Sequence, residues 1–94
     1  MIKYKLGYFA ESLCGHDKGR IYMIVREEED MVGLSDGKRR QLGNPKYKKK
    51  KHVQMIRSEK TAEAFSALIS SADGDAQIRK EISTLEKRIK ENRR

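Results

Sequence analysis

The chain has 94 residues, with 22 Lys and Arg against 14 Asp and Glu and a formal net charge of +8. This length allows one small hydrophobic core and no second independent one. The single cysteine, Cys14, excludes an internal disulfide, and no apolar run approaches the length of a signal-peptide core or a membrane span. We therefore expect a cytoplasmic protein with no membrane partner.

The positive charge is concentrated in one short window. Residues 1–57 carry a net charge of +7 and residues 58–94 a net charge of +1, while residues 36–52 alone carry +7. A localised positive field raises the local concentration of polyanions. Nucleic acid is therefore the first candidate partner, ahead of an acidic protein or an anionic membrane surface.

Up to Arg57 the pattern predicts short strands separated by turns. Apolar residues alternate along most of them and occupy both faces of residues 20–27, which is typical of a strand buried on both sides. Asp36–Gly37 predicts a hairpin turn, and Pro45 ends the strand that follows it. The predicted strands, which together indicate a small five-stranded barrel or curved sheet, are residues 5–10, 20–27, 31–35, 39–42 and 52–56.

After Arg57 the period becomes helical. Ser58 is the expected N-cap of a first helix, Gly74 the cap at its end, and Asp75 the N-cap of a second. The second helix, over residues 76–92, is too short to form a coiled coil alone. We expect it to pack on the first helix or the barrel, or to fray, or else to support weak self-association or docking of a partner. Its apolar stripe, spaced as a heptad, consists of Ile78, Ile82, Leu85 and Ile89.

These periods divide the chain into a β domain over residues 1–57 and a helical extension over residues 58–94. The fold class is therefore mainly β with a helical tail.

No group of residues indicates catalysis. Cys14, His16 and His52 do not match a zinc-ligand spacing, and no nucleophile stands with a base. The acidic residues 27–30 lie at an expected hairpin tip, where exposure prevents tuning of their pKa values by burial. We predict a non-catalytic protein with no cofactor and no metal.

Lys48–Lys51 forms a run of four lysines that we expect to be a loop between two strands. Four adjacent like charges gain nothing from folding alone, so a loop that keeps them together indicates a bound polyanion. A solvated basic loop and a nuclear localisation signal are the alternatives. Replacing the four lysines with alanine is expected to weaken the salt dependence of binding and leave the fold intact.

Two stretches resemble a known family. "GYFAESLCGHDKGRIYMIV", residues 7–25, resembles the KOW motif, in which a turn with an obligatory glycine (Gly19) joins two apolar strands. "LSDGKRRQLGNPKYKKKKHVQ", residues 34–54, resembles the continuation found in KOW-type large-subunit ribosomal proteins of archaea and eukaryotes and in small bacterial KOW-domain RNA-binding proteins. The resemblance implies an SH3-like β-barrel that contacts RNA, commonly ribosomal RNA, through its loops. His16 departs from the arginine that this pattern has before Asp-Lys-Gly.

The basic residues suggest how RNA would be bound. Lysines act as point charges on phosphates, while arginines can bond a phosphate bidentately. Tyr47 is a candidate either for stacking on an unpaired base or for packing over the barrel rim. Phosphate contacts alone do not distinguish RNA from duplex DNA, and the family resemblance favours RNA. The predicted RNA-binding residues are Lys18, Arg20, Lys38, Arg39, Arg40, Lys46, Tyr47, Lys48, Lys49, Lys50, Lys51 and His52, and the predicted turn residues are Gly15, Gly19, Gly37 and Pro45.

The sequence thus predicts an RNA-binding module that contacts ribosomal RNA or a ribosomal particle, with ribosomal proteins as further candidate partners. The alternative is a protein-interaction module that docks a partner through the C-terminal heptad helix.

Overall fold

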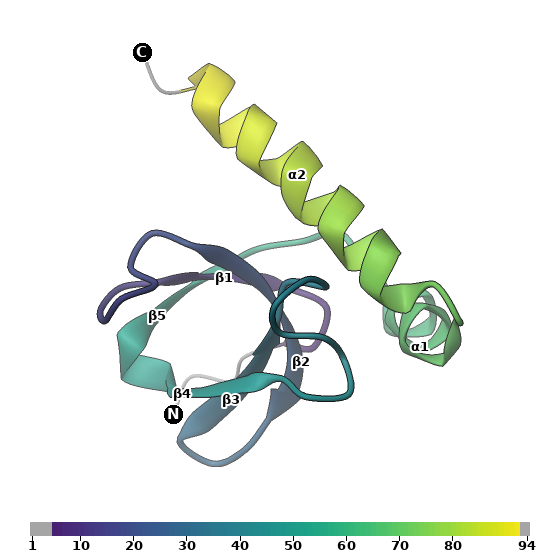
Figure 1. Ribbon diagram of the computed structural model, residues 1–94, viewed down its shortest axis with the longest axis horizontal. Coiled ribbons are helices and arrows are strands. Elements are labelled where there is room, and N and C mark those ends of the chain that lie inside the picture. Colours follow the sequence, from purple (N-terminus) through teal and green to yellow (C-terminus); the bar gives the residue numbers. More distant parts are fainter. Residues whose placement is uncertain (1–4, 93–94) are drawn as a thin grey trace.

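The computed structural model describes residues 5–92, which form five antiparallel strands in one open sheet followed by two C-terminal helices (Figure 1). Residues 1–4 and 93–94, the outer ends of the two predicted domains, lie outside the described residues. The elements are β1 (Phe9–Ser12), β2 (Ile21–Glu27), β3 (Met31–Ser35), β4 (Lys46–Lys49), the 3-10 turn η1 (Lys50–His52), β5 (Val53–Ile56), α1 (Ala62–Ser70) and α2 (Gly74–Asn92).

The strand order across the sheet is β4-β3-β2-β1-β5, so β2 is central and the two edge strands are joined by η1. Figure 1 shows the strands curving around a common centre, with α2 outside the curve. No ladder joins β4 to β5 within residues 5–92, and the sheet is therefore open.

Two hydrophobic clusters lie on opposite faces of the sheet. Alternate residues of β2 enter both of them, because successive side chains of a strand point to opposite faces. This confirms the prediction of a strand buried on both sides. The inner cluster consists of Ala10, Tyr22, Ile24, Val32, Leu34 and Val53. The outer cluster, between the sheet and the helices, consists of Phe9, Ile21, Met23, Val25, Phe65, Leu68, Ile78 and Ile82.

The apolar stripe of α2 packs on the protein's own sheet. Ile78 and Ile82 are buried in the outer cluster, and Leu85 and Ile89 are half-buried against it. This is the packing that the sequence analysis gave as its first expectation, and it buries the first half of the stripe. Neither helix among residues 5–92 combines the length and the apolar character needed to cross a membrane.

The fourth strand was predicted in the wrong place, since residues 39–42 form part of a loop. The carboxylate of Asp36 accepts hydrogen bonds from the backbone amides of Lys38 and Arg40, each at 2.9 Å. The carbonyl of Arg40 accepts from the amides of Asp36 and Gly37 at 3.0 and 3.2 Å. These bonds close residues 36–40 into a compact loop, so Asp36–Gly37 does not join two paired strands. The fourth strand is Lys46–Lys49, within the lysine run.

The first strand also starts later than predicted. Residues 5–8 form a turn, in which the amide of Tyr8 donates to the carbonyl of Lys5 at 3.1 Å and Gly7 has a φ of +91°. Strand β1 begins at Phe9 and continues to Ser12. The predicted strand over residues 31–35 is confirmed, and the last strand begins at Val53.

The helix caps differ from those predicted. Helix α1 begins at Ala62, because the side chain of Thr61, and not of Ser58, accepts from the backbone amide of Ala64 at 3.0 Å. Helix α2 begins at Gly74, where a Cβ would lie 2.6 Å from the carbonyl oxygen of Leu68. Gly74 is therefore needed for close packing and does not cap the end of α1.

Candidate nucleic-acid interface

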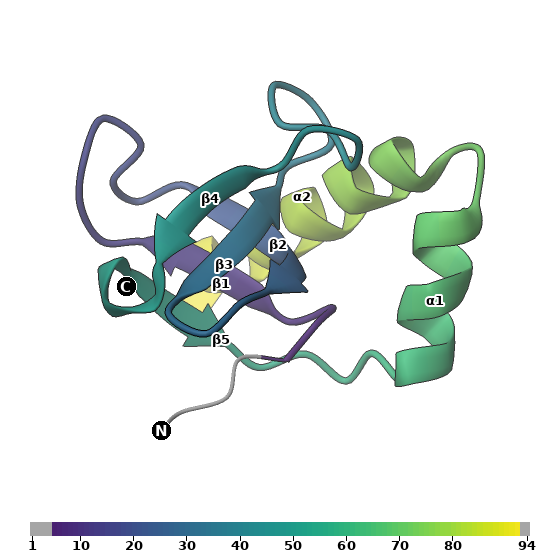
Figure 2. The same ribbon diagram turned by 90° about the horizontal axis from the view of Figure 1, so that it is seen from below.

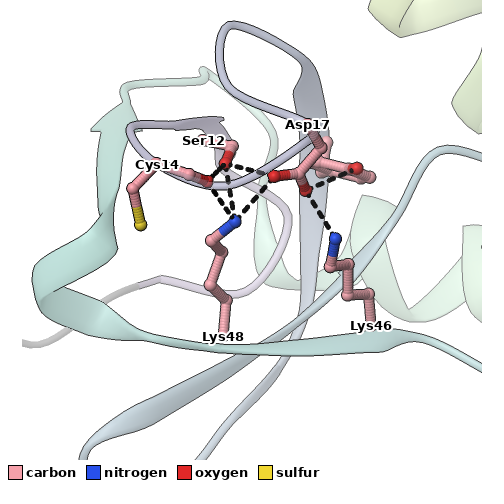
Figure 3. Close-up of polar contacts among 6 residues, drawn as sticks. Ser12, Cys14, Asp17, Lys46 and Lys48 are labelled. Carbon is pink, nitrogen blue, oxygen red and sulfur yellow. Dashed lines mark hydrogen bonds and ion pairs between the residues drawn. The ribbon is translucent and has the colours of Figure 1, made fainter.

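The carboxylate of Asp17, in the loop between β1 and β2, is the centre of a polar cluster (Figure 3). Lys48 Nζ lies 2.7 Å from Asp17 Oδ1, and Lys46 Nζ lies 2.9 Å from Oδ2. The hydroxyls of Ser12 and Tyr22 donate to the same carboxylate at 2.7 and 2.9 Å. Asp17 is only 5% exposed. We refer to these five residues as the Asp17 cluster.

Strand geometry explains why Lys46 and Lys48 reach this carboxylate. They pair across the ladder with Leu34 and Val32, whose side chains are fully buried in the inner cluster. Paired residues point to the same face, so both lysine side chains leave β4 on its inner side. Their alkyl chains can then cover apolar surface, while the ammonium groups bind Asp17 at the rim.

The surroundings of Asp17 keep it ionised. Burial opposes the charged form, but the hydrogen bonds from Lys46, Lys48, Ser12 and Tyr22 outweigh burial and hold the pKa of Asp17 well below its usual range. Burial, followed by the hydrogen bond to Asp17 and its negative charge, raises the pKa of Tyr22 to about 12. At neutral pH the cluster therefore contains one carboxylate facing two lysine ammonium groups.

Lys50 is also engaged within the protein. Its Nζ lies 2.9 Å from Glu27 Oε2 and 3.0 Å from the carbonyl oxygen of Glu29. Its backbone amide donates to the backbone carbonyl of Asp30 at 2.9 Å. The turn η1 is thus docked on the hairpin between β2 and β3. The lysine run is not a loop, and the expectation that its charges gain nothing from folding was wrong for Lys48 and Lys50.

Six of the ten lysines and arginines predicted for the interface are exposed. The other four are half-buried, as is His52; these four are Arg40, Lys46, Lys48 and Lys50. Among the exposed ones, Arg20 from the β1–β2 loop and Lys38 from the β3–β4 loop line one groove of about 460 Å³. The two basic loops therefore meet at this groove. The six exposed residues are Lys18, Arg20, Lys38, Arg39, Lys49 and Lys51.

Helix α2 supplies a further cation to this groove. Arg79 lines it together with Asp36 and Glu86. The guanidinium of Arg79 also donates to the carbonyl of Gly37, which fixes the groove wall. The sequence analysis missed Arg79. Its position directly after Ile78, at the edge of the apolar stripe, could have indicated that it lies near the sheet.

The β3–β4 loop is fastened directly to the start of α2. The amide of Leu42 donates to Asp75 Oδ1 at 2.8 Å, so Asp75 binds this loop and was wrongly predicted as a helix cap. Gly37 has a φ of +74°, and a Cβ there would lie 2.1 Å from the carbonyl oxygen of Asp75. The helices, which the KOW resemblance does not cover, thus hold one of the two basic loops in place.

The other predicted turn residues are placed as expected. Gly15 and Gly19 have φ values of +89° and +90°, a region that favours glycine, and Pro45 lies directly before β4. Cys14 is half-buried, and its carbonyl accepts from Lys48 Nζ at 2.7 Å. In the part of the chain that the structure describes, no three His, Cys, Asp or Glu side chains are grouped so that they could hold a metal ion.

Tyr47 and Lys49 lie on the outer face of β4, opposite to Lys46 and Lys48, because alternate residues of a strand face opposite sides. Both are exposed, as is Lys51 in η1. Of the predicted set, Arg20 and Lys38 thus line the groove and Tyr47 and Lys49 lie on the outer face. Lys46, Lys48 and Lys50 are held in ion pairs.

No protein-family description matches the chain, and a search of characterised proteins finds no match either. The likeness to the KOW family depends on the residues quoted from the sequence.

Proposed function

We propose that the protein is a non-catalytic, cytoplasmic RNA-binding module of the KOW type that binds ribosomal RNA or a ribosomal particle. The curved five-stranded sheet around one apolar cluster supports an SH3-like barrel, whose edge strands β4 and β5 would be brought together by η1. An interior filled by side chains leaves the loops and the rim for recognition.

The observation that carries this proposal is the meeting of the two basic loops at one groove. Arg20 and Lys38 are separated in the sequence by the whole β2–β3 hairpin, yet they line the same cavity beside Arg79. The Asp17 cluster contributes by tying the β1–β2 loop to β4 through Lys46 and Lys48. Loops fixed in this way lose little conformational entropy when a polyanion binds.

The exposed cations define the chemistry of binding. Lysine ammonium groups would contact phosphates as point charges, and the guanidinium groups of Arg20 and Arg39 can bind them bidentately. Six exposed cations that each neutralise a phosphate correspond to a slope of log affinity against log salt of about −4 to −5.

A salt titration of binding to a structured ribosomal RNA fragment tests the proposal. Replacing four exposed loop cations, two from each basic loop, with glutamine should make the slope of log affinity against log salt shallower by about 3. Each lost phosphate contact removes about 0.7 to 0.9 from the slope. A control with the same loss of charge replaces exposed cations of α2 and of the segment after β5, three of which line a different groove. The test variant replaces Lys18, Arg20, Lys38 and Arg39 with glutamine, and the control replaces Arg57, Lys80, Lys87 and Arg88 with glutamine.

Equal slopes for the two variants would overturn the proposed surface. Duplex DNA of the same length is titrated in parallel, since phosphate contacts do not distinguish the two polymers. Co-sedimentation with ribosomal particles across the same salt series tests the ribosomal part of the proposal, and absence of the protein from the particles at low salt would contradict it.

The alternative of a module that docks a protein through α2 has less support. Ile78 and Ile82 are buried on the sheet, and Leu85 and Ile89 are half-buried against the same cluster. Part of the apolar stripe from which that alternative was inferred is therefore already occupied by the protein's own sheet.

A further inference from the structure

The helices cover only part of the outer face of the sheet. Arg26, Gly33 and Tyr47 form one cross-strand row over β2, β3 and β4, with Arg26 paired to Gly33 and Gly33 paired to Tyr47. Figure 2 looks onto this part of the sheet, where β3 and β4 lie in front and no helix covers them. Arg26 is exposed, and Tyr47 is 43% exposed.

Gly33 allows the two large side chains of this row to converge. A Cβ at Gly33 would lie 2.8 Å from Cβ of Arg26 and 3.2 Å from Cε1 of Tyr47. Glycine within a strand costs about 0.5–1 kcal/mol relative to alanine. Here it lets the Tyr47 ring extend over β3 beside Arg26, with much of the ring still open to solvent.

The charges around this ring favour an anionic chain. Lys49 lies two residues along the same face of β4, and Arg26 adjoins the ring on the other side across Gly33. Neither cation forms an ion pair in the part of the chain that the structure describes. The acidic hairpin tip, residues 28–30, lies beyond the pair formed by Met31 and Lys49, so Lys49 stands between the Tyr47 ring and the tip.

We propose that this outer face binds single-stranded RNA, with an unpaired base stacked on Tyr47 and the flanking phosphates contacted by Arg26 and Lys49. Bases within a duplex do not present their faces, whereas an unpaired base can stack on an exposed aromatic ring. The inference rests on the proposed RNA-binding function and deepens it, because it assigns unpaired nucleotides to one defined surface.

Fluorescence anisotropy with two labelled probes tests this inference, a 12-nucleotide oligouridylate and a 12-base-pair RNA duplex. Tyr47→Ile keeps an apolar, strand-favouring side chain over Gly33 but removes the ring, and Tyr47→Phe is the matched control that keeps it. We expect Tyr47→Ile to bind oligouridylate about 5- to 150-fold more weakly, since stacking of one base contributes about 1–3 kcal/mol. Tyr47→Phe should stay within about twofold of the unmodified protein, because the stacking face is retained.

Two further readouts separate stacking from a change in structure. The slope of log affinity against log salt should be the same for Tyr47→Ile and the unmodified protein, because no charge is lost. Arg26→Gln should instead make the oligouridylate slope shallower by about 0.7, and Arg57→Gln, which lies on another groove, should not.

Unchanged binding of oligouridylate by Tyr47→Ile would overturn the inference and leave the proposed function standing. Equal weakening on both probes, with a lower melting temperature, would also overturn it, because Tyr47 would then only stabilise the edge of the sheet. If the unmodified protein binds neither probe, the inference fails, while the proposed function is decided separately by the salt titration with structured ribosomal RNA.

Discussion

Replacing Lys48 with methionine should destabilise the protein substantially, although lysine-to-methionine changes on a surface are usually mild. Lys48 Nζ donates to Asp17, to Ser12 Oγ and to the carbonyl of Cys14, at 2.7, 2.8 and 2.7 Å. Its side chain is 11% exposed, and that of Asp17 is 7% exposed. Hydrogen bonds to charged groups contribute about 1.5–3 kcal/mol each.

Removing one member of a buried ion pair lowers the free energy of unfolding by about 3–5 kcal/mol when the remaining charge has no other partner. Lys46 stays beside Asp17 in the variant, so we expect a smaller loss, about 2–4 kcal/mol. For a domain of this size the melting temperature should fall by roughly 10–30 °C. The matched control is Lys49→Met, the same change at the next, exposed position, which should cost less than about 0.5 kcal/mol.

Urea unfolding at pH 7, followed by circular dichroism, measures both variants against the unmodified protein. A difference of less than about 0.5 kcal/mol between Lys48→Met and Lys49→Met would refute the reasoning, because the buried ion pair would then contribute nothing. The same contacts argue against the expectation that alanine at Lys48–Lys51 leaves the fold intact. Exposed loop cations are the better choice for tests of RNA binding.

The pKa of Asp17 is lower in the folded protein than in the unfolded chain, so its stabilising effect is present above about pH 4 and is lost as the pH falls below it. Urea unfolding at pH 7, 4 and 2.5 should show a smaller loss of stability for Asp17→Asn than for the unmodified protein, and parallel losses would contradict this. Gly37→Ala should lower the free energy of unfolding by about 2–5 kcal/mol, because it combines a positive φ with a clash against α2. Gly19→Ala, at a position with a similar φ and open space around it, should lower the free energy of unfolding by about 1–2 kcal/mol. Equal losses for Gly37→Ala and Gly19→Ala in the same urea assay would show that the loop at Gly37 is not packed tightly on α2.

The elements that were predicted correctly are those whose pattern is local. Strand β2 has apolar residues on both faces, and α2 has apolar residues at helical spacing. In each case the local spacing of apolar residues predicts the buried face, and the element packed against it need not be known. Strand β4 could not be found in this way, because lysine has no preference for strands. Its inward lysines are stabilised by Asp17, which lies 29 and 31 residues away along the chain.

The candidate site was predictable as a region but not residue by residue. The charge window, residues 36–52, located the β3–β4 loop, and glycines that have positive φ lie in the turns of both basic loops. Which lysines are exposed depends on partners that the sequence does not place, such as Glu27 beside Lys50. The alternation of half-buried and exposed residues from Lys46 to His52 follows from the strand and the turn after it, and becomes visible only once β4 is recognised.

The position of the lysines at a margin of the sheet has a consequence apart from any ligand. Strand β4 has β3 on one side and no neighbouring strand on the other among residues 5–92. An exposed edge strand can pair with a strand of another molecule and start aggregation. Lysines on edge strands are a common feature that prevents such pairing. Two copies approaching through β4 would bring Lys49 and Lys51 of each copy together, and mutual repulsion would keep the molecules apart. Part of the positive charge of this chain therefore opposes edge-to-edge association of the protein with its own copies.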